Sequence, residues 1–488
     1  MLIFSSKRLY QFIIIPQPMQ EKKYISQFFC RCLVSITLAA GALLCACDRR
    51  SARLDLLACD DSIRDYVSIE PHSVAVYASR EDRASGRIEC RIYDDEYEIF
   101  SRMFACMNEK EIAAAYLAKG SGRFTDSLKE RVASCNNGNH RPNTRPNKGR
   151  ILEGLRIAVD PGHSASNMDE AKRESKYMLI VAPDGRRFSF FEAALNLATA
   201  RLLKKLLEDD GATVMLTRNE NRQVYPIPYE AWRRRYFRRA VMEKVREGHI
   251  TAAQGRILLR TGDDRRRLKF FNSEYEMPYR AEAINAFHPH LTIMVHYDAS
   301  WPPHAPIQKY ARLLEVLSKS HSSRDEHMAE IQEVLDSIPL TDRNTSTVFV
   351  PGCFLRGEVQ TVEDRIALLR LIITSDLDRS IQFAAEVMKA FRSKLDVPAE
   401  NAHMPASKEV GRCRTGVYAR NLRMTRLVWG TLCLGEPLHQ NHLAEAERLA
   451  VIEKGLIPER VVQVARAYHE AVRAYVRRYG VRESNPPK

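Results

Sequence analysis

The amino-acid sequence predicts an α/β fold, with a mostly parallel, twisted sheet and helices on both faces of that sheet. From residue 155 onward, short apolar runs alternate with longer amphipathic segments of helical period, which is typical of βαβ units. Two of the apolar runs, Leu155–Val159 and Leu291–Val295, are followed closely by a histidine, and open sheets place their ligands at such strand ends. A small N-terminal α+β region and two helical insertions complete the predicted architecture.

The predicted elements of the sheet follow in chain order. A strand at 156–160 precedes a helix at 191–208, and Gly211 ends that helix before a strand at 213–216. The later elements are a helix at 279–287, a strand ending at His296, a helix at 376–392, an apolar strand at 427–434 and a helical segment over 443–478.

The start of the chain predicts an export signal over residues 1–47. Lys22 and Lys23 precede an apolar run from about residue 28 to 44, and the run ends in Leu44-Cys45-Ala46-Cys47. This end resembles the lipobox of bacterial lipoproteins, whose mature chain begins at a lipid-modified cysteine, here Cys47. A transmembrane anchor is the alternative, although the run is near the short end of the ~20 residues that span a bilayer. Both interpretations place most of the chain outside the cytoplasm, and the first anchors it by lipid in the cell envelope, facing the periplasm.

Three further regions follow the signal. Residues 48–134 combine strand-like pieces, such as 73–77, with a helical segment near 109–118, and their role is unknown. Residues 135–150 are rich in turn formers and predict a linker. Residues 151–480 form the main predicted domain, which insertions at 219–278 and 301–350 interrupt.

The cysteines give no metal motif. The chain holds 11 cysteines, four of them within the predicted signal, and no CxxC pair that would indicate a thiolate zinc site. Isolated disulfides among Cys59, Cys90, Cys106 and Cys135 are compatible with an oxidising compartment. Their pairing stays open.

The charge of the chain indicates an anionic partner. Its 75 basic and 61 acidic residues give a formal net charge of +14, which suits nucleic acid, a lipid surface or an envelope polymer. The export signal argues against nucleic acid, which we do not expect as a partner. The insertion at 219–278 concentrates arginines among aromatic residues: it is either a cationic arm for an anionic polymer or membrane, or a solvated helical insertion.

Three polar residues form a candidate metal site. His163 follows the strand and turn Asp160-Pro161-Gly162, Glu192 lies in the first turn of the first long helix, and His296 ends a second apolar strand. Two imidazoles and a carboxylate leave the fourth tetrahedral position of zinc open, as in catalytic sites. Taken singly, the three residues also fit a turn residue, a carboxylate favoured by the helix dipole and a structural histidine.

In this order, these motifs resemble the zinc-dependent N-acetylmuramoyl-L-alanine amidases of the amidase-3 type, which are peptidoglycan hydrolases. The shared features are the strand followed by Asp-Pro-Gly-His, the glutamate on the first helix, and the stretch from Val295 to Ser300, which is similar to the family's S-I-H-x-N-A strand end. Three more stretches agree: Gly211–Arg218, Arg280 with Asn285, and Gly416–Leu422. The resemblance covers roughly residues 155–460, apart from the insertions.

The resemblance implies an activity and roles for the residues. It implies hydrolysis of the amide between N-acetylmuramic acid and L-alanine in peptidoglycan, with Zn²⁺ held by His163, Glu192 and His296. Asp160 is a candidate for orienting a metal ligand, or a turn former. Arg280 and Arg420 are candidates for gripping a stem-peptide carboxylate, or members of structural ion pairs. An envelope activator protein is a further candidate partner.

The catalytic glutamate of the family is where the sequence departs from the pattern. The family carries it in a V-E-x-G-F-x-S-N-like run, and the corresponding stretch here is Thr431–Asn441. Aligning the two on Gly435 puts Cys433 at the glutamate position, whereas aligning them on Asn441 puts Glu436 near it. We prefer Glu436 as the general base, because a strand end before proline lets a side chain project into the site. An exposed loop carboxylate and a role for His439 are the alternatives.

Two other functions compete with the amidase. One is a non-catalytic, peptidoglycan-binding envelope lipoprotein with a degenerate amidase site, which the mismatch at Glu436 supports. The other is a related zinc exopeptidase or amidohydrolase on the same fold.

Overall fold

The computed structural model describes residues 49–135, 150–319, 323–411 and 415–480. The predicted signal, with Cys47, and most of the predicted linker lie outside the described residues. Arg50–Lys488 form one compact unit, which is described below. Among the described residues, no helix combines the length and apolar character needed to cross a bilayer.

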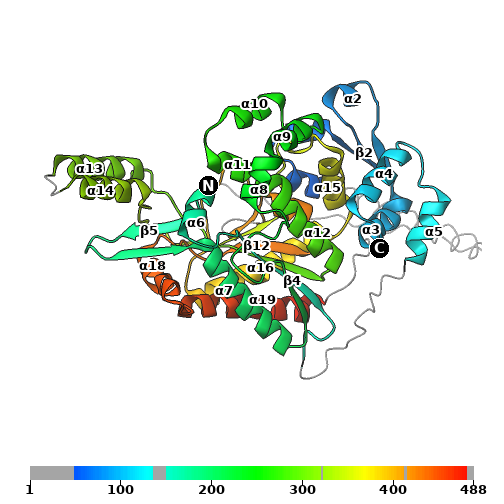
Figure 1. Ribbon diagram of the computed structural model, residues 1–488. Helices are drawn as coiled ribbons and strands as arrows, with labels where there is room; N and C mark the ends of the chain where they lie inside the picture. Colours follow the sequence, from blue (N-terminus) through cyan, green and yellow to red (C-terminus); the bar gives the residue numbers. More distant parts are fainter. Residues whose placement is uncertain (1–48, 136–149, 320–322, 412–414, 481–488) are drawn as a thin grey trace, which may run out of the picture. The chain divides into compact units, whose positions relative to one another are not determined.

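A central sheet of seven strands organises the main domain (Figure 1), in the order β10-β11-β9-β12-β8-β4-β7. The strands are β4 (Arg156–Pro161), β7 (Thr213–Leu216), β8 (Leu291–Val295), β9 (Thr347–Val350), β10 (Lys408–Glu409), β11 (Val417–Ala419) and β12 (Leu432–Glu436). Strands β7, β4, β8 and β12 are parallel, β9 runs antiparallel to β12, and β11 is parallel to β9. The predicted α/β fold with a mostly parallel sheet is confirmed.

Helices cover both faces of this sheet because alternate strand residues point to opposite sides. Ile157 and Val159 of β4 belong to the larger core, together with residues of three packed helices, α7 (Glu192–Asp209), α16 (Asp376–Leu395) and α19 (Glu459–Tyr479). Ala158, between them, belongs to a second core with α12 (Met277–Phe287) and α17 (Arg423–Leu427). The fully buried strands of such a sheet read as continuous apolar runs, which is how the sequence revealed them.

Several elements differ from the predicted ones. A hairpin of β5 (Tyr177–Val181) and β6 (Arg187–Phe191) follows α6 (Met168–Glu174), between β4 and α7. The predicted strand at 427–434 begins only at Leu432, since Leu427 ends α17. The predicted helical segment at 443–478 consists of α18 (Leu443–Leu449), a 3₁₀ segment (Ala450–Lys454) and α19. Another helix, α15 (Val362–Ile373), packs against α17.

The N-terminal region is α+β, as predicted, and shares a core with the main domain. Its antiparallel sheet joins β1 (Val67–Glu70), β2 (Ser73–Val76) and β3 (Cys90–Tyr93), and its helices are α2 (Arg80–Ala84), α3 (Tyr97–Cys106), α4 (Glu109–Lys119) and α5 (Asp126–Ser134). The guanidinium of Arg365 donates to both carboxylate oxygens of Glu89, at 2.7 and 2.6 Å. Arg53 donates to Asp378 at 2.6 Å. The two regions therefore pack as one body.

The two insertions are helical. The first holds α8 (Tyr229–Arg235), α9 (Phe237–Arg246), α10 (Ala252–Arg260) and α11 (Asp264–Phe271), which we call the helical arm, and a π-helical turn (Asn272–Glu276) leads from it into α12. The second holds a hairpin of α13 (Ala305–Ser318) and α14 (Arg324–Asp336), which stands apart from the sheet in Figure 1. Strand β9 falls inside the range predicted for the second insertion, yet it pairs with β12 and β11 within the central sheet.

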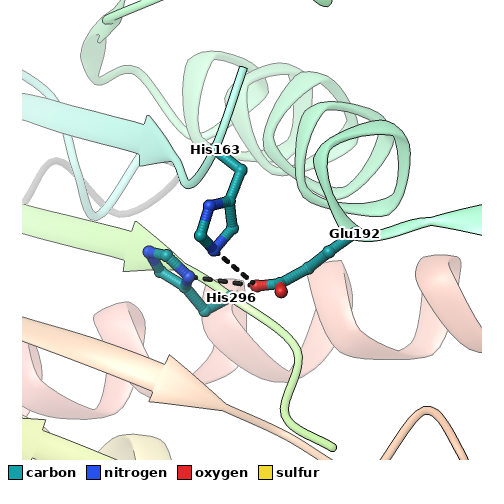
Figure 2. Close-up of side chains that lie close together, drawn as sticks. All are labelled: His163, Glu192 and His296. Atoms are coloured by element: carbon teal, nitrogen blue, oxygen red, sulfur yellow. Dashed lines mark hydrogen bonds and ion pairs between the residues drawn. The ribbon is translucent and has the colours of Figure 1, made fainter. Parts of the chain in front are cut away.

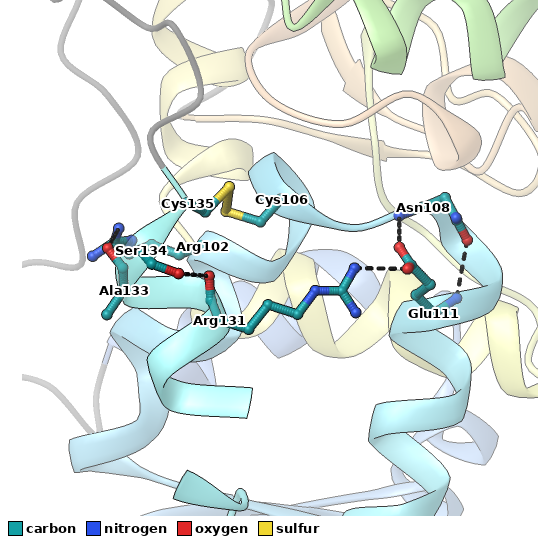
Figure 3. Close-up of a disulfide and its surroundings, with 8 residues drawn as sticks. All are labelled: Arg102, Cys106, Asn108, Glu111, Arg131, Ala133, Ser134 and Cys135. Atoms are coloured by element: carbon teal, nitrogen blue, oxygen red, sulfur yellow. Dashed lines mark hydrogen bonds and ion pairs between the residues drawn. A yellow bond between two sulfur atoms is a disulfide. The ribbon is translucent and has the colours of Figure 1, made fainter. Parts of the chain in front are cut away.

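A disulfide closes the N-terminal helices (Figure 3). Cys106 at the end of α3 bonds Cys135 beyond the end of α5, with the two Cα atoms 6.0 Å apart. Cys59, Cys90, Cys353 and Cys433 are free thiols. Of the pairings that the sequence left open, the structure contains Cys106–Cys135.

Removing this disulfide should destabilise the protein. The bond joins residues 29 positions apart, and closing a loop of that length in the unfolded chain is worth about 3–4 kcal/mol in the chain-entropy model. The double variant Cys106→Ser/Cys135→Ser should therefore unfold at a lower urea concentration than the oxidised protein. Reduced wild-type protein is the matched control, and equal midpoints for the variant and the oxidised protein would contradict the expectation.

Candidate metal centre

The turn after β4 places His163 at the carboxyl end of the sheet. The Gly162 amide donates to the carbonyl of Val295 on the neighbouring strand at 2.9 Å, and the Gly162 carbonyl accepts from Asn196 at 2.9 Å and Arg218 at 3.0 Å. His163 itself adopts a left-handed backbone conformation, with φ at 58°. Such a conformation costs ~1–3 kcal/mol in a non-glycine residue and persists where the surroundings enforce it, often at functional sites.

Glu192 and His296 complete a cluster with His163 (Figure 2). Glu192 is the first residue of α7, and His296 directly follows β8. The Oε1 atom of Glu192 lies 3.3 Å from His163 Nε2 and 3.1 Å from His296 Nδ1. One ligand atom from each residue lies within 4.8 Å of the others. The structure thus brings together the three residues that the sequence singled out.

The donor atoms of the cluster fit a divalent metal ion. His163 Nε2 is buried without a hydrogen-bond partner. Burial lowers the pKa of His163 to about 4, so its imidazole is neutral, the form that binds metals. Burial alone would raise the pKa of Glu192, but His163, in the pH range where it is protonated, and the nearby Lys176 ammonium hold it well below its usual value. Two imidazoles and a carboxylate are a ligand set that suits zinc.

Position 162, beside this cluster, has room only for a glycine. A Cβ atom on Gly162 would lie 2.2 Å from His296 Cε1 and 2.3 Å from its Nε2. The Asp160-Pro161-Gly162-His163 turn therefore needs its glycine because the His296 ring packs against that backbone.

The variant Gly162→Ala should displace the His296 ring and weaken metal binding. We expect zinc affinity to fall by at least 10-fold, the lower end of the loss that follows when the support of a metal ligand is removed. Competition titration with a zinc chelator measures this. Gly357→Ala is the matched control, because a Cβ on Gly357 meets no atom within 4 Å. Equal affinities for the two variants would contradict the close contact.

Asp160 and Arg280 form a buried ion pair beneath the turn. Asp160 Oδ1 accepts from Arg280 Nε at 2.9 Å and from the hydroxyl of Thr217, and Arg280 Nη2 donates to the Pro161 carbonyl at 2.7 Å. The Arg280 side chain is only 5 % exposed. The pair fixes the end of β4. The geometry therefore favours a structural ion pair for Arg280 over binding of a substrate carboxylate.

Arg420 lies at the opposite edge of the sheet. It follows β11, which is parallel to β9 and therefore antiparallel to β12. The end of β11 thus points away from the ends of β4, β8 and β12, and the Arg420 guanidinium lies over the Phe349 ring, 5.5 Å from its centroid. Arg420 is not part of the site described here, because the reversal at β9 separates it from the cluster.

Glu436 ends β12, next to the strand that carries His296. The His296 amide donates to the Gly435 carbonyl at 3.1 Å, so Glu436 follows the residue that pairs with His296. Burial raises the pKa of Glu436 well above its usual value, and the nearby Asp298 carboxylate raises it further, while Lys176 opposes the shift. Cys433, by contrast, is completely buried in the larger core. Of the two aligned candidates, only Glu436 is at the strand end.

Three polar residues near the cluster escaped the sequence analysis. Glu174 Oε2 lies 3.6 Å from His163 Nδ1, and Lys176 Nζ lies 3.3 Å from Glu192 Oε2. The Asp298 carboxylate is near enough to Glu436 to raise the pKa of that residue. Burial raises the pKa of Glu174 to about 7. A signal for Lys176 was present: Pro183-Asp184-Gly185 is a turn signal between two strand-like runs, and the resulting hairpin places Lys176 opposite Glu192.

His439 contacts Asp298 rather than the cluster. Its Nδ1 lies 2.9 Å from the carbonyl of Arg343, and its Nε2 lies 3.6 Å from Asp298 Oδ2. A cavity of about 760 Å³ lies beside the His163 turn, between Ser164, Glu174 and Arg218 and the arm residues Tyr229 and Phe271. The helical arm thus forms one wall of the space beside the cluster.

Comparison with known families identifies the family of the chain. The family model Amidase_3, described as N-acetylmuramoyl-L-alanine amidase, matches residues 157–449. The chain belongs to this family, which confirms the family that the sequence motifs indicated and makes the protein a peptidoglycan amidase by class. Among curated proteins, none matches the chain.

The chain is also similar to three solved structures of amidases. The amidase Ami1 from Mycobacterium smegmatis is 12% identical, with 67% of this chain and 98% of that chain covered and a TM-score of 0.34. An N-acetylmuramoyl-L-alanine amidase from Clostridium difficile 630 is 13% identical, with 67% and 98% covered and a TM-score of 0.32. The CwlD amidase from Clostridioides difficile, solved in complex with the GerS lipoprotein, is 13% identical, with 66% and 98% covered and a TM-score of 0.30.

Proposed function

We propose that the protein is a zinc-dependent N-acetylmuramoyl-L-alanine amidase that cleaves the amide between N-acetylmuramic acid and L-alanine in peptidoglycan. The observation that carries the proposal is the convergence of His163, Glu192 and His296, whose ligand atoms lie within 4.8 Å of one another, in a chain of the amidase family. Three protein ligands leave one position for water or substrate, as in catalytic zinc sites. When bound there, zinc supplies the Lewis acidity that activates water and polarises a carbonyl.

Glu436 is the proposed general base. In this role a carboxylate oxygen of Glu436 takes a proton from the attacking water and delivers it to the departing amine of L-alanine. The raised pKa of Glu436, caused by burial and by Asp298, brings the carboxyl closer to neutral pH, where a group that first accepts and then donates a proton works best.

Glu174 and Lys176 are proposed to hold two of the metal ligands in place. A histidine that binds metal through one nitrogen commonly faces a carboxylate with the other, and Glu174 occupies that position beside His163 Nδ1. Lys176 faces the Glu192 oxygen that neither histidine contacts. Both residues orient ligands and touch neither water nor substrate in this scheme.

Product analysis tests the function. Purified protein loaded with zinc should release peptides with a free L-alanine amino terminus from sacculi and leave the glycan strands intact, as detected by mass spectrometry. An exopeptidase on the same fold would release other products. The departure from the family pattern around Cys433 and Gly435 favours one other candidate, a lipoprotein that binds peptidoglycan without cutting it. That protein would sediment with sacculi and release no peptide.

We further propose that the mature chain is an envelope lipoprotein facing the periplasm, with its lipid on Cys47. Cys47→Ser should abolish incorporation of radiolabelled palmitate and leave an uncleaved or soluble product, because lipid attachment needs that thiol. Cys45→Ser is the control, and it should retain the label. Labelling of Cys47→Ser but not of Cys45→Ser would show that the lipobox begins elsewhere.

A further inference from the structure

The helical arm is a small folded body with an aromatic core. The Trp232 ring lies 5.0 Å from the Phe271 ring and 5.1 Å from the Tyr275 ring, measured between centroids. Tyr229 and Phe270 are buried in the same cluster. The aromatic residues that accompany the arginines in the sequence are therefore mostly internal, and they hold the four helices that present the arginines.

Four arginines of the arm meet around one cavity, which we call the arginine pocket. Its volume is about 420 Å³, and it is lined by Arg233, Arg234, Phe237, Arg238, Leu259 and Arg267. These residues come from all four helices, α8 to α11. The packing of the arm, rather than one arginine-rich segment, thus creates the pocket.

The positive charge of the arginine pocket is largely uncompensated. Arg233 is paired with Glu230 at 3.0 Å, but in the part of the chain that the structure describes, Arg234 and Arg238 are exposed and form no ion pair. Arg267 donates to the Thr261 carbonyl, and its Nε is buried without a hydrogen-bond partner. Between Tyr229 and Phe271, 13 arginines and lysines stand against 5 aspartates and glutamates. An anion in the pocket would relieve this repulsion.

The pocket combines guanidinium groups with apolar surface. Planar guanidinium forks match the oxygens of a phosphate group. Phe237 and Leu259 line the same pocket, and Ile257 and Met242 on α10 and α9 are 52% and 59% exposed. Phosphate beside apolar surface is the chemistry of a phospholipid headgroup at a membrane surface, whereas a free phosphate offers no partner for the apolar side chains.

We propose that the arginine pocket binds the phosphate of an anionic phospholipid and so holds the helical arm against a membrane surface. This contact goes beyond the amidase function, and it requires neither the metal cluster nor a lipid on Cys47. Because the arm also forms one wall of the cavity beside His163, the contact would set the distance of that cavity from the membrane.

Vesicle binding tests the proposal. Residues 50–488 form one compact unit with its own cores, so this fragment can be used without the first 49 residues. It should co-sediment with phosphatidylcholine vesicles that contain one quarter phosphatidylglycerol and not with pure phosphatidylcholine, and added salt should weaken the binding. Arg234→Glu/Arg238→Glu should lower the partition coefficient by about 30-fold or more, since each arginine near an anionic surface contributes ~5-fold. The milder variant Arg234→Gln/Arg238→Gln should also lower the partition coefficient. It serves as the test if the charge reversal disturbs folding.

A matched variant distinguishes binding in the arginine pocket from attraction by the net charge of the helical arm. Arg265→Glu/Arg266→Glu makes the same change of charge on the same arm but outside the pocket, at arginines that face Asp263 at 3.5 and 3.6 Å. It should retain most of the binding, and Leu259→Ser should weaken it. Equal losses in both arginine variants would overturn the pocket. Full competition by soluble glycerol phosphate, with no effect of Leu259→Ser, would also overturn the proposal and would indicate a site for free phosphate. Binding to sacculi in place of vesicles would overturn it as well and would indicate a wall polymer as the partner.

Discussion

Replacing either histidine of the cluster by alanine should abolish stable zinc binding. Removing a residue that only supports a metal ligand commonly costs 10–100-fold in affinity, and we expect the loss of a ligand itself to exceed about 100-fold. His163→Ala and His296→Ala should each contain less than stoichiometric zinc after dialysis against a weak chelator, whereas the wild type should keep close to one zinc per chain. Hydrolysis of sacculi should fall with the metal.

The control for this experiment is His304→Ala. His304 is an exposed histidine in the loop between β8 and α13. A loss of zinc in His304→Ala would therefore indicate adventitious binding at the surface. Full zinc occupancy in both His163→Ala and His296→Ala would show that the metal is bound elsewhere. Circular dichroism establishes whether the variants are folded, since His163 also shapes the turn after β4.

Replacing Glu436 by glutamine should separate catalysis from metal binding. Glutamine keeps the size of the side chain and removes the carboxylate that would accept the proton from water. Turnover should fall by roughly 10²–10⁴-fold, the usual contribution of acid–base assistance, while the zinc content stays at the wild-type value. In the wild type, burial and Asp298 raise the pKa of Glu436 and a base acts deprotonated, so activity should be lost as the pH falls through that raised pKa.

Cys433→Ala is the comparison that decides between the two alignments. Cys433 is buried in the core, so its replacement should cost some stability and leave most of the activity. An essential Cys433 with a dispensable Glu436 would favour the alignment on Gly435. The protein would then either use different chemistry or not hydrolyse peptidoglycan.

The residues of the metal cluster could be predicted because their signals are local. His296 directly follows a buried apolar strand, His163 follows another after one glycine, and Glu192 opens a long amphipathic helix. The sequence itself therefore shows which side chains reach the edge of the sheet. Parallel strands then bring these ends together without further information. The fold class followed from the same alternation of strands and helices.

Other parts depend on tertiary pairing that the sequence does not show. Glu174 and Lys176 reach the cluster because α6 and the β5–β6 hairpin lie beside it. The turn at residues 183–185 indicates the hairpin, but it does not show which side chain faces Glu192. β9 runs against the direction of β12, so neither its place in the sheet nor the displacement of Arg420 could be predicted. The role of Arg280 was ambiguous until its buried partner, Asp160, was known.

The bidentate pair between Arg365 and Glu89 has a consequence for how this chain can be divided. A turn-rich stretch before residue 150 suggests that the catalytic domain could be produced without the N-terminal region. Such a truncation would remove Glu89 and leave the guanidinium of Arg365 unpaired, although its side chain is only 5% exposed. An unpaired buried charge is strongly destabilising, and the shared core would be opened to water as well. The N-terminal region thus forms part of the interior of the enzyme. Truncation, domain swapping or recombination at the apparent boundary would separate two regions that unfold as one cooperative unit.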